Sequence, residues 1–192
     1  MPRPRTFDDT EVIEAAMHAF WDRGYEATSA DELCRRTGLG RGSLYNAFGT
    51  KQSLYEEAVR RYADITFQNL LTALERPGPL KERLRAFMYG VIDTDVVDAD
   101  HRGCLVVNAA VEVSPRNEGV REIIRRQSAR METTLCGVLV IAQRAGEVSA
   151  DTDPLRATRT ILTVLNGLRV LGKVATERDA LTDAVDGVLA TL

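Results

Sequence analysis

The sequence predicts an all-α fold of about nine helices, in which a three-helix N-terminal unit precedes a larger helical unit. Apolar residues recur at three- and four-residue spacing along most of the chain. Gly and Pro, at 14 and 6 of 192 residues, are few enough to allow long helices. Several segments begin with a capping residue and end at Gly or Pro. With 44% hydrophobic residues, such a chain can bury a sizeable core. We place the division between the two units after residue 50, giving ranges 1–50 and 51–192.

The first predicted helix runs from about Asp8 to Arg23, with acidic residues at its positive end. Gly24 is expected to end this helix. The apolar residues that recur at helical spacing along it are Val12, Ala16, Ala19 and Phe20. They are expected to pack against the two helices that follow.

Two short helices joined by a glycine turn are predicted between Thr28 and Lys51. Ser29 and Glu32 stand three residues apart, which is the spacing of a capping box at the start of a helix. Gly38 suits the left-handed position that ends this first short helix.

The second short helix begins near Gly40 or Arg41 and is too short to be stable alone in water. Its Leu44 and Phe48 face is therefore expected to dock on neighbouring helices, with polar side chains on the opposite face. This layout is typical of a helix-turn-helix recognition helix.

The rest of the chain predicts six further helices with recognisable ends. Thr50 caps the first of them, Pro77-Gly78-Pro79 stops it, and Asp153-Pro154 is a cap followed by a first-turn proline. An acidic, irregular stretch is expected at Asp93–Arg102. The expected ranges are Lys51 to about Glu75, Leu80–Val97, Gly103–Val113, Ser114–Asn117 to Gly146, Asp153 to about Ala175, and Asp179–Leu192.

The N-terminal third of the chain resembles the DNA-binding domain of TetR-family transcriptional regulators. The residues that carry the resemblance are Phe20, Gly24, Tyr25, Thr28, Ser29, Gly38, Gly42, Ser43, Leu44, Tyr45, Phe48, Lys51, Leu54 and Tyr55. Gly40 departs from the pattern, because the recognition helix of the family often opens with Ser or Thr. Glycine costs only a few tenths of a kcal/mol at a helix cap, so the helix is still expected.

The resemblance implies a binding surface for double-stranded operator DNA. Tyr45 and Lys51 match positions that contact phosphates, and Thr28 stands at a helix N-terminus, where backbone N–H groups favour a phosphate. Gly42 lets the backbone approach closely. The predicted base readers are Arg41, Ser43 and Asn46. The tail Met1–Thr6, with Arg3 and Arg5, is either a solvated terminus or an arm that touches DNA.

A pocket for an unknown small-molecule effector is predicted in the larger unit. Its expected lining residues are Tyr62, Phe87, Met88, Cys104, Asn108, Glu112 and Gln127. Cys104, Asn108 and Glu112 share one face of an apolar helix, where they either contact a ligand or bond to neighbouring helix ends. The Cys104 thiol is either a sensor of oxidants and electrophiles or an inert buried group.

The last two helices are more apolar than a surface helix requires. Their apolar residues are either core or, as the resemblance implies, a two-fold interface of a homodimer. The predicted interface residues are Leu162, Leu165, Leu168, Val185 and Leu189.

Composition and the motifs present argue against several classes of function. A net charge of -3 argues against a protein that coats DNA, but allows a small basic patch. Three scattered cysteines, no signal peptide and no transmembrane run predict a reduced, cytoplasmic protein without a membrane partner. No catalytic set, metal-ligand set or cofactor motif is visible.

The sequence therefore predicts a DNA-binding regulator, most simply a repressor that a ligand releases from its operator. The alternatives are a ligand-independent DNA-binding protein and, less readily, a helical module or enzyme that does not bind DNA.

Overall fold

The structure is a computed structural model that describes residues 7–97 and 100–192. All regular elements among these residues are helices, and none is both long and apolar enough to cross a membrane. The arginine-bearing tail at 1–6 lies outside the described residues. The elements are α1 (Asp9–Ala27), α2 (Ala30–Thr37), α3 (Arg41–Phe48), α4 (Lys51–Leu74), α5 (Leu80–Val97), α6 (Leu105–Glu112), the 3₁₀ turn η1 (Ser114–Arg116), α7 (Glu118–Arg144), α8 (Pro154–Leu171) and α9 (Asp179–Leu189).

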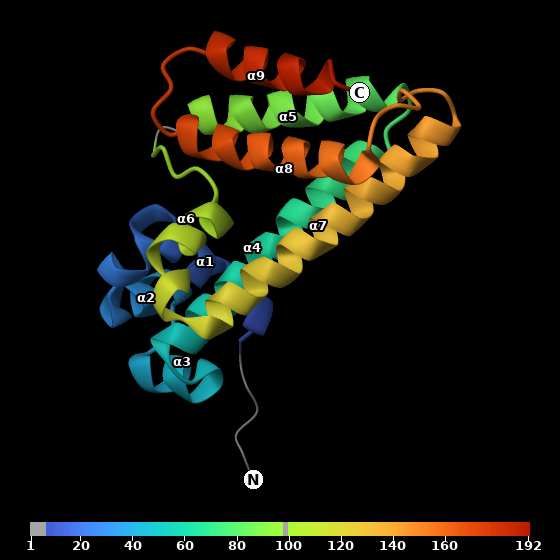
Figure 1. Ribbon diagram of the computed structural model, residues 1–192. Helices are drawn as coiled ribbons and strands as arrows, with labels where there is room; N and C mark the ends of the chain where they lie inside the picture. Colours follow the sequence, from blue (N-terminus) through green and yellow to red (C-terminus); the bar gives the residue numbers. More distant parts are fainter. Residues whose placement is uncertain (1–6, 98–99) are drawn as a thin grey trace.

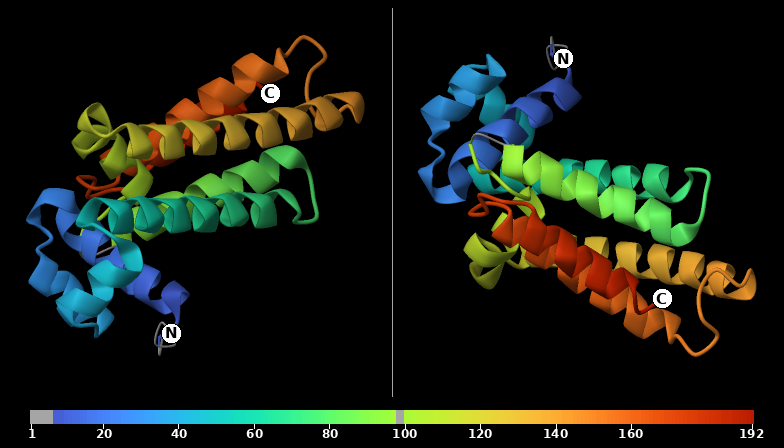
Figure 2. Two further views of the ribbon diagram at one scale, coloured as in Figure 1. Left: turned by 90° about the horizontal axis from the view of Figure 1, so that it is seen from below. Right: turned by 90° about the horizontal axis from the view of Figure 1, so that it is seen from above.

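Helices α1, α2 and α3 form a head at one end of the molecule, and the remaining helices form the body (Figure 1). The long helices α4 and α7 pack along each other and extend from the head to the far end of the body. Helices α5, α8 and α9 pack together over the outer part of this pair (Figures 1 and 2). The short α6 lies between the head and these three helices, where it contacts α1, α4, α7 and α8.

The cap and glycine positions predicted in the head are found in the structure. Gly24 has a φ of 78° and breaks the helical path near the end of α1, and Gly38 ends α2 with a φ of 69°. The Ser29 hydroxyl accepts the Glu32 backbone N–H at 3.1 Å, as a helix cap should. The Glu32 carboxylate accepts hydrogen bonds from Arg35 and Arg36. These contacts hold the pKa of Glu32 below its usual range, with the bond from Arg35 contributing most.

The apolar interior divides into two clusters. The outer cluster joins the far half of α4 to α5, α7, α8 and α9. The head cluster contains the buried faces of α1, α2, α3 and the first half of α4, but it also contains residues 104–123 of the body. The head therefore completes its core with α6 and the start of α7, so the unit 1–50 does not enclose a core of its own. The boundary at residue 50 stays a prediction.

Several predicted helix ends differ from the structure. The first helix is predicted to end at Gly24, but α1 continues past the break at Gly24 to Ala27. The segment predicted as Gly103–Val113 begins its helix only at Leu105, because Gly103 has a φ of 62° and Cys104 is extended. The last two helices end at Leu171 and Leu189, short of the predicted Ala175 and Leu192. The first part of the stretch predicted as irregular continues α5 to Val97, and residues 98–99 lie outside the described residues.

Four of the five residues predicted to form the dimer interface are covered within a single chain. Leu165, Leu168, Val185 and Leu189 are between 0% and 7% exposed within a single chain and belong to the outer cluster. Leu162 is half-buried against the same cluster. Their place in a dimer interface stays a prediction. The exposed apolar side chains of this region are instead Leu155, Val170, Leu171 and Val174.

Candidate nucleic-acid interface and internal cavity

Helix α3 is docked by one face and exposed on the other. Leu44 is fully buried beneath it, and Phe48 is half-buried against the head cluster. Arg41, Gly42, Ser43 and Asn46 are all exposed, and Tyr45 is half-buried at the edge of the same surface. The structure thus leaves all three predicted base readers, Arg41, Ser43 and Asn46, exposed on α3.

The N-terminal turn of α3 has glycine at two positions, Gly40 and Gly42, and no side-chain cap. Gly40 starts the helix without a side-chain cap, and a Cβ added at Gly40 or Gly42 would meet no atom within 4 Å. Packing within the chain does not require glycine at either position. A surface that must approach closely from outside would account for it, because glycine lets the backbone itself reach that surface.

The two cationic residues of the predicted surface are held differently. The Arg41 guanidinium donates to the exposed Asp31 carboxylate at 2.9 Å, in an ion pair that water and salt weaken strongly. The Lys51 ammonium lies 4.5 Å from the centre of the Tyr25 ring and donates to the Glu26 carbonyl at 3.4 Å. The Arg41 guanidinium is therefore held only weakly, whereas the Lys51 ammonium is fixed beside the turn that precedes α2.

Thr28 is not on the surface. Its side chain is fully buried, and its hydroxyl donates to the backbone carbonyls of Gly24 at 2.6 Å and Ala19 at 3.3 Å. Any phosphate contact at this position would have to use backbone N–H groups at the start of α2. The side chain instead fastens the turn between α1 and α2.

A cavity of about 610 Å³ lies in the body beneath the head, among α1, α4, α5, α7 and α8. Four predicted residues line it: Tyr62, Phe87, Cys104 and Gln127. The sequence reading missed Met17, Trp21 and Arg169, which join them from α1 and α8. Burial raises the pKa of Tyr62, and the adjacent Cys104 raises it further, so its hydroxyl is a neutral donor and acceptor across the physiological range.

Three predicted ligand contacts lie outside this cavity. Met88 is fully buried in the outer cluster. Asn108 donates to the Arg102 carbonyl at 2.9 Å and accepts from the Lys173 ammonium at 3.3 Å. Glu112 accepts the backbone N–H groups of Tyr25 at 3.2 Å and Glu26 at 3.0 Å. For Asn108 and Glu112 the structure thus shows the bonding to neighbouring segments that the sequence left open.

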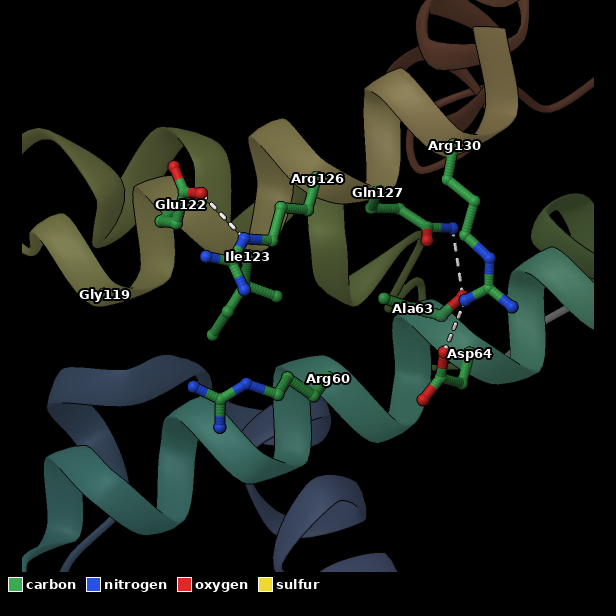
Figure 3. Close-up of a pocket in the computed structure, with 9 residues that line it drawn as sticks. All are labelled: Arg60, Ala63, Asp64, Gly119, Glu122, Ile123, Arg126, Gln127 and Arg130. Atoms are coloured by element: carbon green, nitrogen blue, oxygen red, sulfur yellow. Dashed lines mark hydrogen bonds and ion pairs between the residues drawn. The ribbon is translucent and has the colours of Figure 1, made fainter. Parts of the chain in front are cut away.

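A second, smaller cavity of about 310 Å³ opens between α4 and α7 (Figure 3). Arg60 on α4 and Arg126 on α7 flank it, and Arg130 donates across it to Asp64 at 2.8 Å. Gln127 lines this cavity and the larger one, so its side chain separates the two.

Two family models together cover most of the chain. The model of bacterial regulatory proteins of the tetR family matches residues 12–58, and the tetracyclin repressor-like C-terminal domain matches residues 80–188. The chain belongs to the TetR family of transcriptional regulators.

Individual relatives agree with this assignment along the whole chain. YezE of Bacillus subtilis (strain 168), an uncharacterized HTH-type transcriptional regulator, is 31% identical over 193 residues, which is 100% of each chain. The repressor ComR of Escherichia coli (strain K12) is 27% identical over 169 residues, covering 88% of this chain and 80% of ComR. A cysteine mutant of the TetR-family regulator CifR, solved with 26-base-pair operator DNA, superposes with a TM-score of 0.83, 30% identity and 98% of each chain covered.

Within this TetR-family chain, Glu112 links α6 to the head, and the sequence left open which segment it would contact. The Glu112 carboxylate lies against Gly24, where a Cβ would come within 3.0 Å of Glu112 Oε2. Because Gly24 has a positive φ, the backbone after it turns so that two consecutive N–H groups meet one carboxylate. A lone glutamate at the end of an apolar helix gives no sequence signal for a contact 86 residues away.

Proposed function

We propose that this protein is a homodimeric transcriptional repressor that binds operator DNA through α3 and releases it when a small molecule occupies the larger cavity. The observation that carries the proposal is the open face of α3, with Arg41, Ser43 and Asn46 exposed above a buried Leu44. Family membership and the operator complex of CifR support it. The proposal assigns the chain no catalytic role.

Contacts to DNA divide into two kinds. Lys51 and Tyr45 carry a charge and a hydroxyl at the edges of the face, where they fix the position of the head on phosphates without reading sequence. Arg41 and Asn46 have planar groups that can form paired hydrogen bonds with guanine and adenine edges. Ser43 adds a hydroxyl between them.

The first prediction separates these roles. Tyr45→Phe and Lys51→Ala should weaken binding to every DNA sequence alike. Arg41→Ala and Asn46→Ala should each lose about 1–3 kcal/mol at particular base pairs and relax the preference there. Selection of genomic DNA fragments by the wild-type chain supplies the operator, and fluorescence anisotropy on single-base variants measures the preference. If base preference is unchanged in both alanine variants, α3 does not read the sequence as proposed.

A second copy is proposed to pack on the outer faces of α8 and α9. The end of α8 and the residues just after it expose three apolar side chains, Val170, Leu171 and Val174. The exposed side of α9 carries the small residues Ala184 and Gly187, which would let a second copy approach closely. A two-fold dimer places two α3 helices on one side, so the operator should contain inverted half-sites about one helical turn apart or somewhat more.

The ligand is proposed to act through α4. This helix begins at Lys51, beside the DNA-reading surface, and lines the larger cavity from Tyr62 onward. A ligand that favours a different tilt of α4 changes the separation of the two reading heads. It needs only to bind the two states unequally, and a tenfold difference corresponds to about 1.4 kcal/mol.

The second prediction follows by linkage: operator DNA must weaken ligand binding by the same factor by which ligand weakens DNA binding. Once a ligand is found, calorimetric titrations with and without operator DNA should give different affinities. Equal affinities would mean that the cavity is not coupled to DNA release. The chain would then be a ligand-independent DNA-binding protein.

A further inference from the structure

Glu112 contacts the head and lies outside the lining of both cavities described above. It is the last residue of α6, and its carboxylate accepts the backbone N–H groups of Tyr25 at 3.2 Å and Glu26 at 3.0 Å. Consecutive N–H groups that converge in this way form an anion-binding turn, and Gly24 leaves room for the carboxylate because it has no Cβ. Glu112 therefore fastens the turn 24–29, which precedes α2, to α6 of the body (Figure 1).

The Lys51 ammonium contacts the same two residues. It donates to the Glu26 carbonyl at 3.4 Å, and it lies 4.5 Å from the centre of the Tyr25 ring. That ring is itself packed, with its centre 4.8 Å from the centre of the Tyr55 ring. Lysine carries its charge on a flexible four-carbon stem, so these contacts restrict an ammonium that would otherwise occupy many positions. The residues that Glu112 holds by their backbone are thus the residues that hold Lys51.

The held position of Lys51 bears on its proposed contact with DNA. Helix α2 begins at Ala30, directly after the turn 24–29, and the first N–H groups of a helix favour a nearby phosphate. Lys51 is kept beside the turn that leads into this helix start. An ammonium that is already ordered there gives up less conformational freedom when it meets a phosphate than an unrestrained one does.

We propose that Glu112 is a positioning residue for DNA binding. By fixing the turn 24–29 from the side of the body, its carboxylate keeps the Lys51 ammonium where that ammonium meets a phosphate. Glu112 acts through the turn and not through a contact of its own with DNA. The inference rests on the proposed function, from which it takes the phosphate contact of Lys51. It adds a residue of the body to the groups that determine how tightly the head binds.

Glu112→Ala should weaken binding to operator DNA and to unrelated DNA alike, by about threefold to tenfold for each head that binds. The direction is informative, because removing a negative charge would by itself strengthen binding to a polyanion. The preference at base pairs read by Arg41 and Asn46 should stay unchanged. Fluorescence anisotropy at one fixed salt concentration measures affinity and preference, and circular dichroism checks that the variant is folded.

Glu122→Ala is the matched control. It removes the same charge from a partly exposed carboxylate of the body, which accepts hydrogen bonds from Arg125 and Arg126. These bonds lie within α7, away from the turn 24–29. Glu122→Ala should therefore not weaken DNA binding.

A double-mutant cycle with Lys51→Ala separates positioning from a general structural role. In the Lys51→Ala background, Glu112→Ala should cause no further loss of DNA affinity, because the ammonium that it positions is gone. A carboxylate that merely stabilises the head would cause the same loss with or without Lys51. Glu112→Gln keeps one accepting oxygen for the two N–H groups, so its loss should be smaller, and it takes the place of Glu112→Ala in the cycle if that variant does not fold.

Four results would overturn the inference: unchanged or stronger DNA binding by Glu112→Ala, an equal loss in Glu122→Ala, a changed base preference, or fully additive losses in the cycle. If Lys51→Ala still weakened binding to all sequences alike, the proposed function would stand in each of these cases. Failure of the wild-type chain to bind any operator would overturn the proposed function and the inference together.

Discussion

Replacing Leu189 by arginine should prevent the chain from folding, whereas the same change at Val174 should leave a folded protein. Leu189 is 1% exposed, and Val174 is 77% exposed. An arginine at Leu189 would be buried among apolar side chains without a carboxylate partner, at a cost of more than about 4 kcal/mol. That is a large share of the stability of a typical domain, which is about 5–15 kcal/mol. Circular dichroism and urea unfolding measure the difference.

Val174→Arg should act on assembly instead. Placed on the exposed surface beyond α8, the charge should lower the proportion of dimer at micromolar concentration, as measured by light scattering. A cooperatively folded Leu189→Arg chain would contradict the burial of α9 within its own protomer. A wild-type chain that is monomeric would contradict the proposed dimer.

Substituting alanine for Gly24 should destabilise the protein, whereas the same substitution at Gly137 should stabilise it. Gly24 has a φ of 78°, and its Cβ would press against the Glu112 carboxylate. With a ψ of 172° as well, Gly24 lies in a region that essentially only glycine adopts, so the backbone strain alone costs about 1–3 kcal/mol, and displacement of the carboxylate adds to it. Gly137 lies within α7 with open space around it, so alanine there should gain up to about 1 kcal/mol of helix propensity.

A double-mutant cycle with Glu112→Ala isolates the contact between α6 and the head. If the carboxylate contributes to the cost at Gly24, the two substitutions together should cost less than the sum of each alone. Amide exchange at Tyr25 and Glu26 should accelerate in Glu112→Ala, because these two N–H groups lose their acceptor. Strictly additive unfolding free energies with unchanged exchange would show that the contact does not stabilise the head.

Local signals predicted most of the fold. Caps and helix-ending residues such as Ser29, Gly38 and Asp153 act within one helical turn, so the sequence displays both partners of each interaction. The exposed face of α3 was predictable for the same reason: eight residues with Leu44 on one side must leave the polar side outside.

Features that depend on distant segments were not predictable in this way. The apolar stripes of α8 and α9 show that something covers them, but their periodicity is the same whether a second copy or the same chain does so. Leu165 and Leu189 were assigned to a second copy, whereas the chain itself already covers them. Likewise, the polar residues of α6 share one face, yet only the tertiary arrangement sends Cys104 to the cavity and Glu112 to the head.

The head cluster joins segments of the chain that a ribosome synthesises at different times. Residues 12–62 emerge first, but the apolar faces of α1 and α4 are completed by side chains between 104 and 123. Until that later segment has left the exit tunnel, these apolar faces of the nascent head stay exposed to water. Chaperones can bind such a surface, and other nascent chains can aggregate with it. A messenger truncated after α5 would therefore yield a head that is fully encoded but left with these faces uncovered.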